Sequence, residues 1–139
     1  MDPQQRLFLE EGYRAFEDAG RAPQELSESR CGVYLGISGS EYGTLVQQRL
    51  GLVDMIGSSP AIAAARIAYF LNLKGPAIPV DTACSSSLVA MHLACQALRN
   101  GEVDLALAGG VALYLMPELY VCMCAAGVLS PKGLSLIHI

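Results

Sequence analysis

The sequence contains no tryptophan and little charge. Charged residues make up 16% of its 139 residues, against roughly 25% in an average soluble domain. Hydrophobic residues make up 53%, which excludes an intrinsically disordered chain. The length suits one domain. The apolar excess predicts that part of the surface meets a partner subunit or more of the same polypeptide.

Positive charge is also scarce. Nine Lys and Arg against thirteen Asp and Glu give a net charge of −4 with no basic cluster, which argues against nucleic-acid binding. The first residues lack the basic and then apolar pattern of a signal peptide, so we expect a cytoplasmic protein. The most apolar stretch, residues 105–129, is divided by Pro117-Glu118 into runs shorter than the about 18–20 residues of a membrane span. It predicts a buried strand followed by a buried helix.

The cysteines form neither a disulfide framework nor a metal site. Their number, five, is odd and no C-x-x-C pair occurs, so we expect no bound metal and a reducing compartment. Cys122-Met123-Cys124 has no neighbouring His or acidic ligand and is predicted to belong to the core. Gly109-Gly110 lacks the glycine spacing of a dinucleotide-binding loop.

Helix and strand signals alternate along the chain, which predicts a layered α/β protein with a mainly buried sheet. Asp2-Pro3 and Ser59-Pro60 are typical helix starts. Pro79 cannot donate to a sheet ladder, so its strand should lie at an edge, a bulge or another chain. Arg66, in an apolar helix, should pair with a carboxylate or a carbonyl. The expected elements are helices over 2–19, near 45–50, over 61–71 and over 85–99, and strands over 31–37, 77–81 and 105–111.

The residues around Cys84 carry the chemistry. This cysteine lies between a predicted strand and a helix that begins with three serines. The positive end of the helix dipole and the free N–H groups of the first turn favour a thiolate there. The N–H of Cys84 could also donate to the oxyanion formed on a thioester carbonyl, so acyl transfer is the expected reaction class. From the residues alone, a packing role for this cysteine stays open.

The segment DTACSSS at 81–87, preceded by KGPA at 74–77, resembles the active-site region of β-ketoacyl synthase domains from modular polyketide synthases. The resemblance extends over residues 1–133, which we interpret as part of such a domain. Other segments that resemble the family in the same order are MDPQQR (1–6), EDAG (17–20), GV (32–33), ARIAY (65–69), AGGV (108–111) and LSP (129–131).

The resemblance implies a thiolase-like fold, layered α-β-α-β-α, with only part of its N-terminal half present. It implies a homodimer in which the strand before the nucleophile pairs with its copy, which would account for Pro79. Cys84 would accept an acyl chain from the phosphopantetheine arm of an acyl carrier protein, with no bound cofactor. A decarboxylating malonyl-type unit would then extend it. Other synthase modules are expected partners.

Several further residues receive roles from this resemblance and from their place in the sequence. Thr82, Ala83 and Ser85 would support the turn around the nucleophile, and Asp81 would shape that turn rather than transfer protons. Tyr120 and Met123 are candidates for the acyl tunnel or a dimer contact.

Two features depart from the family. The family uses two histidines for decarboxylation, and neither His92 nor His138 matches their motifs, so we expect the catalytic histidines and the family's first strand to lie outside this chain. The chain alone should not condense. His92 is predicted to pack or to form a hydrogen bond. Residues 134–139 break the pattern and are interpreted as a non-native tail from sequencing-adapter read-through.

Other functions stay open. A ketosynthase-like chain that no longer elongates would act as a docking or dimerisation scaffold. A fatty-acid synthase type of ketosynthase is a further alternative. Thiolases and chalcone-type synthases share the expected fold and the cysteine, but the residues around their cysteine differ from those at 82–87. A starter enzyme that only decarboxylates usually lacks the cysteine.

Overall fold

The structure is a computed structural model, and it describes residues 1–50 and 55–134. Its centre is a three-stranded parallel sheet in the order β2-β1-β3, made by β1 (Cys31–Ile37), β2 (Ala77–Val80) and β3 (Leu105–Val111). The positions of the predicted strands are therefore confirmed, and the strand that contains Pro79 lies at an edge. The burial predicted for 105–111 is wrong, because only Leu107 of β3 is buried. The last five residues of the tail interpreted as non-native, 135–139, lie outside the described residues.

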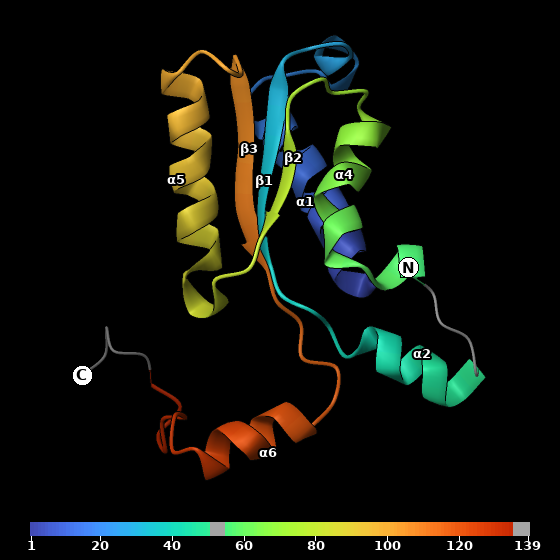
Figure 1. Ribbon diagram of the computed structural model, residues 1–139, viewed down its shortest axis with the longest axis vertical. Helices are drawn as coiled ribbons and strands as arrows, with labels where there is room; N and C mark the ends of the chain where they lie inside the picture. Colours follow the sequence, from blue (N-terminus) through green and yellow to red (C-terminus); the bar gives the residue numbers. More distant parts are fainter. Residues whose placement is uncertain (51–54, 135–139) are drawn as a thin grey trace.

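Helices cover both faces of this sheet (Figure 1). On one face lies α5 (Ser86–Arg99), which contacts β1 and β3, and on the other lie α1 (Pro3–Asp18) and α4 (Pro60–Phe70). The shorter helices α2 (Tyr42–Leu50) and α6 (Glu118–Ala125) lie beyond the end of the sheet in Figure 1. The remaining helical segments are α3 (Met55–Ser58) and the 3-10 turns η1 (Pro23–Leu26) and η2 (Ala83–Ser85).

The central strand explains the two cores. All seven residues of β1 are buried, because helices cover both of its faces and a strand pairs along each edge. Side chains alternate along a strand. Val33 and Leu35 accordingly belong to the core that contains Phe8 and Ile67, whereas Tyr34 packs with Ala90 and Ala94 of α5.

Both predicted helix starts are confirmed, but only one serves as a side-chain cap. A carboxylate oxygen of Asp2 accepts a hydrogen bond from the N–H of Gln4 at 2.8 Å, as an N-cap residue should. Ser59 makes no capping bond with its side chain. Its backbone carbonyl instead accepts from the side chain of Gln5 at 3.0 Å and from the N–H of Ile62 at 3.1 Å. The proline at the first position is sufficient to start α4.

A helix follows β3 as predicted, but the prediction that this helix is buried is wrong. α6 has no buried residue, and Cys122 and Cys124 are exposed rather than part of the core. The helix contacts too little of the rest of the chain to be covered, although it is apolar. At the end of α4, Tyr69 and Phe70 are 90% and 62% exposed, so this chain leaves a second apolar surface open. No helix among residues 1–50 and 55–134 combines the length and the apolar character that crossing a membrane requires.

Candidate active site

Cys84 lies in a tight turn between β2 and α5. The turn η2 (Ala83–Ser85) follows the end of β2 after two residues and leads directly into the first residue of α5. Ala83 has φ of 54°, a left-handed conformation that is uncommon for a residue with a side chain. The chain therefore reverses sharply just before the cysteine, and Cys84 is exposed. The predicted sharp turn is present, with its unusual backbone at the residue before the sulfur.

Hydrogen bonds from neighbouring side chains hold this turn. The buried Ser86 accepts from the N–H of Thr82 at 2.9 Å and donates to the carbonyl of Ala83 at 2.7 Å. Ser85 donates to the carbonyl of Thr82 at 2.8 Å. The carboxylate of Asp81 accepts from the N–H of Ala83 at 3.1 Å. Asp81, Thr82, Ala83 and Ser85 each take part in hydrogen bonds within the turn.

Asp81 also ties the turn to the neighbouring strand. Its carboxylate accepts a hydrogen bond from the hydroxyl of Ser38, just after β1, at 2.9 Å. The loops that follow two adjacent parallel strands are thereby joined next to the cysteine. In open α/β sheets, ligands bind beyond the carboxyl ends of the strands.

Two glycines let the start of α5 approach the sheet. A Cβ placed on Gly36 would lie 2.6 Å from the backbone nitrogen of Ser87, and one on Gly110 would lie 2.8 Å from the Cβ of Ser87. A side chain at either position would collide with the helix. Gly110 therefore has a packing role. From the sequence, Gly109-Gly110 is compared only with a dinucleotide-binding loop, and this role is not predicted. These glycines place the turn of Cys84 against the ends of β1 and β3.

A cleft of about 640 Å³ opens in front of this turn. Its walls are the segments that leave β1 and β3, together with the start of α5. The lining is polar on the β1 side and mostly apolar on the β3 side, where Leu113, Tyr114 and Leu119 contribute. The lining residues are Gln4, 36–41, Ala83, Cys84, Ser86, Ser87, 110–114 and Leu119. An exposed thiol therefore lies on one wall of a cleft that has a polar side and an apolar side.

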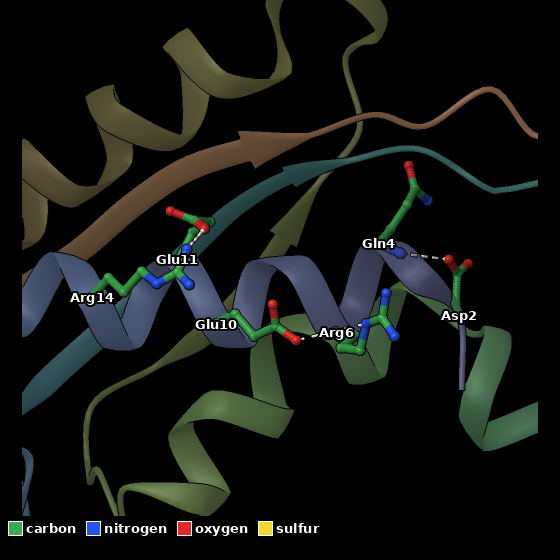
Figure 2. Close-up of polar contacts among 6 residues, drawn as sticks. All are labelled: Asp2, Gln4, Arg6, Glu10, Glu11 and Arg14. Carbon is green, nitrogen blue, oxygen red and sulfur yellow. Dashed lines mark hydrogen bonds and ion pairs between the residues drawn. The ribbon is translucent and has the colours of Figure 1, made fainter.

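Buried polar side chains at the start of α1 support the cleft, and sequence reasoning missed them. Figure 2 shows Gln4 pointing toward the segments that follow β1 and β3. Its side chain accepts from the N–H of Leu113 at 3.0 Å and donates to the carbonyl of Ser38 at 3.4 Å. Asp2, buried beside it, accepts a hydrogen bond from the hydroxyl of Ser40. The outer face of α1 carries the exposed ion pairs Arg6–Glu10 and Arg14–Glu11, which contribute little to stability.

Glu41 is a second cleft residue that the sequence did not reveal. One of its carboxylate oxygens accepts from the N–H of Leu115 at 2.7 Å and from the N–H of Met116 at 2.9 Å. Leu115 and Met116 lie 74 and 75 residues further along the chain. The carboxylate therefore connects the two walls.

The predicted partner of Arg66 is confirmed. The Arg66 guanidinium donates to the side-chain carbonyl oxygen of Gln5 at 2.9 Å. Gln5 is 1% exposed, and its amide also donates to the carbonyls of Ser59 and Ile56. This network joins α1 to the start of α4 and lies outside the cleft lining.

The other cysteines differ from Cys84 in their surroundings. Cys31 is fully buried, and burial raises the pKa of its thiol to about 11, so this sulfur stays protonated and inert at neutral pH. Cys95, Cys122 and Cys124 are exposed but do not line the cleft. Residues 1–50 and 55–134 contain no cluster of three His, Cys, Asp or Glu side chains placed to hold a metal ion.

His92 does not fulfil its predicted role. It is exposed on α5, and its side chain forms no hydrogen bond with the residues that the structure describes. The prediction of a packed or hydrogen-bonded histidine is wrong because this face of α5 is left open in the chain. The same face carries Leu88, Met91 and Leu98, which are 65%, 44% and 42% exposed.

Tyr120 and Met123 lie on α6 behind the cleft. Tyr120 packs edge-on against the cleft residue Tyr114, with ring centroids 5.3 Å apart and planes at 78°. Met123 is half-buried, and neither residue is part of the lining. The structure thus brings Tyr120 next to the cleft and leaves Met123 outside it.

Comparison with known proteins identifies the family. The family model described as "Beta-ketoacyl synthase, N-terminal domain" matches residues 1–136. The chain belongs to the β-ketoacyl synthase family. Polyketide synthase PksL of Bacillus subtilis (strain 168) is 65% identical over 133 residues, which cover 96% of this chain and 3% of that protein. Polyketide synthase ThaG of Burkholderia thailandensis is 45% identical over 136 residues, or 96% of this chain and 2% of that protein.

A solved structure shares the fold of this β-ketoacyl synthase chain. The ketosynthase from module 6 of the bacillaene synthase from Bacillus subtilis 168 superposes with a TM-score of 0.86 at 64% identity, over 96% of this chain and 22% of that one. The predicted resemblance to polyketide ketosynthases and the thiolase-like α/β fold class are confirmed. The chain spans about a fifth of the length of that ketosynthase.

Proposed function

We propose that Cys84 is the acyl-accepting nucleophile of a ketosynthase in polyketide biosynthesis. The observation that carries this proposal is the position of Cys84, exposed in a cleft at the start of α5 and beyond the carboxyl ends of the parallel strands. The similarity to polyketide synthases supports the same reaction class.

The proposed first step is a thioester exchange. The Cys84 sulfur attacks the carbonyl carbon of an acyl group carried on the phosphopantetheine arm of an acyl carrier protein. A new bond forms between this sulfur and the acyl carbon, and the carbon–sulfur bond to the arm breaks. The proton that Cys84 loses balances the one that the departing pantetheine thiol gains. The arm is substrate here, and no resident cofactor is required.

The backbone is proposed to stabilise the charge that develops on the carbonyl oxygen. The first N–H groups of a helix have no partner within the helix, and they lie at the positive end of its dipole. The turn η2 places Cys84 two residues before Ser86, the first residue of α5. Its N–H is therefore proposed to donate to the oxyanion, as fixed backbone donors do in other acyl transferases.

The second step, carbon–carbon bond formation, is proposed for the full ketosynthase. A malonyl-type unit on a carrier protein loses carbon dioxide, and the resulting carbanion attacks the acyl group on Cys84. The products are carbon dioxide, a β-keto thioester on the carrier protein that is longer by two backbone carbons, and the Cys84 thiolate, which takes up a proton from water. The resemblance assigns decarboxylation to two histidines. We do not propose His92 for this role, because it is exposed on α5 and lies outside the cleft lining.

Partners are proposed from the exposed surfaces. The outer edge of β2 pairs with no other strand among the described residues, and Ile78 in it is 38% exposed. This edge supports a homodimer in which β2 pairs with its copy, with Pro79 tolerated at the junction. An acyl carrier protein and neighbouring synthase modules are the other proposed partners.

Acyl loading tests the proposal directly. The full-length protein is incubated with an acetyl thioester of N-acetylcysteamine, and intact-mass analysis counts the acetyl groups it gains. We expect one acetyl group on the unmodified protein and none on the Cys84→Ala variant. Cys95→Ala, which removes an exposed cysteine on the helix that follows the turn, is the matched control and should be acetylated normally. Equal acetylation of the Cys84→Ala variant would overturn the assignment.

A further inference from the structure

The two walls of the cleft come from distant parts of the chain and are joined by side chains. One wall is the segment 38–41, which follows β1, and the other is the segment 112–116, which follows β3 and lines the cleft with residues 112–114. Neither segment belongs to the sheet, so strand pairing does not fix the distance between them. Gln4 and Glu41 supply the connections.

Glu41 makes the most direct connection. Its carboxylate belongs to the first wall and accepts two consecutive backbone N–H groups of the second, those of Leu115 and Met116. Hydrogen bonds to a charged acceptor are shorter and stronger than neutral ones. Both distances, 2.7 and 2.9 Å, lie in the range of such bonds. A single carboxylate therefore sets the position of the backbone that carries Leu113 and Tyr114.

Gln4 holds the same backbone from behind. It is 3% exposed and bonds Leu113 on one side and Ser38 on the other. Leu113 thus receives one contact from α1, while the two residues after Tyr114 receive contacts from Glu41. The apolar side chains of this wall project from a backbone that is fixed on both sides of Tyr114.

We propose that Glu41 is a positioning residue that determines which acyl groups Cys84 accepts. This inference rests on the proposed acyl transfer to Cys84. A two-carbon acyl group needs only the turn around the sulfur, whereas a long acyl chain extends along Leu113 and Tyr114. Displacing this wall therefore changes the transfer of long chains and leaves the transfer of short chains unchanged.

The test compares two substrates in the full-length protein. Rates of Cys84 acylation are measured by mass spectrometry with acetyl and octanoyl thioesters of N-acetylcysteamine. In Glu41→Gln, which removes the charge, we expect the octanoyl rate to fall about tenfold relative to the acetyl rate. Glu17→Gln is the matched control, because it makes the same change on the exposed face of α1 and lies outside the cleft. Its ratio of rates should equal that of the unmodified protein.

A second variant separates positioning from folding. Glu41→Asp keeps the charge but shortens the side chain, so it cannot reach both N–H groups and should also lower the octanoyl rate relative to the acetyl rate. A purely structural role would lower both rates by the same factor, together with the rate at which iodoacetamide alkylates Cys84. An unchanged ratio of rates in both variants, or loss of the folded state in both, overturns the inference. An unmodified protein that takes no acyl group at Cys84 refutes the proposed function instead, and the inference with it.

Discussion

Replacing Gly36 by alanine should displace the nucleophile without touching it. The added Cβ would lie 2.6 Å from the nitrogen of Ser87, 2.7 Å from the carbonyl carbon of Ser86 and 2.9 Å from the Cα of Ser87. All three are backbone atoms, so no change of side-chain rotamer relieves the collision. An ordinary contact begins at 3.4 Å, and the start of α5 must therefore move by about 0.8 Å.

The expected effects follow from that displacement. Forcing one extra methyl group into a packed site typically costs about 1–3 kcal/mol of stability. A misplacement of about 1 Å can reduce the rate of a positioned reaction by about 100-fold. We expect Gly36→Ala to lower the free energy of unfolding by about 1–3 kcal/mol. The rate of Cys84 acetylation should fall further than the loss of folded protein explains.

Gly109 provides the matched control for this experiment. It lies on β3 beside Gly110, but a Cβ there would meet only the ring of Phe8 at 3.8 Å, an ordinary contact. Gly109→Ala should leave both the thermal unfolding midpoint and the acetylation rate close to those of the unmodified protein. Similar losses in Gly36→Ala and Gly109→Ala would refute the argument that close packing of α5 positions the turn.

Two further predictions concern the turn and the buried thiol. Ser86→Ala removes the hydroxyl that pairs with Thr82 and Ala83 and should lower the free energy of unfolding by about 1–2 kcal/mol. Chemical denaturation measures this loss, and a variant as stable as the unmodified protein would contradict it. Burial raises the pKa of Cys31 to about 11, so only the unfolded state loses this proton as the pH rises through about 8.5–10. Stability should fall by about 2 kcal/mol more between pH 8 and pH 10 in the unmodified protein than in Cys31→Ala, and equal losses would contradict the prediction.

The sheet and its helices could be predicted because their signals are local. The apolar run at 31–37 predicts a buried strand, and the proline at 79 restricts its strand to an edge, a bulge or another chain. In the structure, the first is the central strand and the second an edge strand. The position of Cys84 in a turn between a strand and a helix could be predicted for the same reason, since the strand, turn and helix signals are adjacent in the sequence.

The exposed surfaces could not be predicted from such patterns. The apolar sequence of α6 and the open face around His92 do not say whether the chain itself covers them. Burial depends on which other elements pack there, and that is a property of the whole assembly rather than of one helix.

The cleft walls depend on long-range contacts, which also have no local signal. Glu41 reaches backbone groups 74 and 75 residues away, and nothing near Glu41 indicates that distance. Gln4, in contrast, does carry a local signal. It lies four residues before Phe8, followed at the same spacing by Gly12 and Phe16, and all four are buried on one face of α1. A polar residue on the buried face of a helix must find buried partners.

The central claim is that Cys84 alone takes the acyl group within the cleft. Protection from alkylation tests it most directly. The full-length protein is preloaded with an acetyl thioester and then treated with iodoacetamide, and peptide mapping reports the alkylated cysteines. We predict that preloading blocks alkylation of Cys84 while the exposed Cys95, Cys122 and Cys124 are alkylated as before. Undiminished alkylation of Cys84, or equal protection of all four cysteines, would contradict the claim.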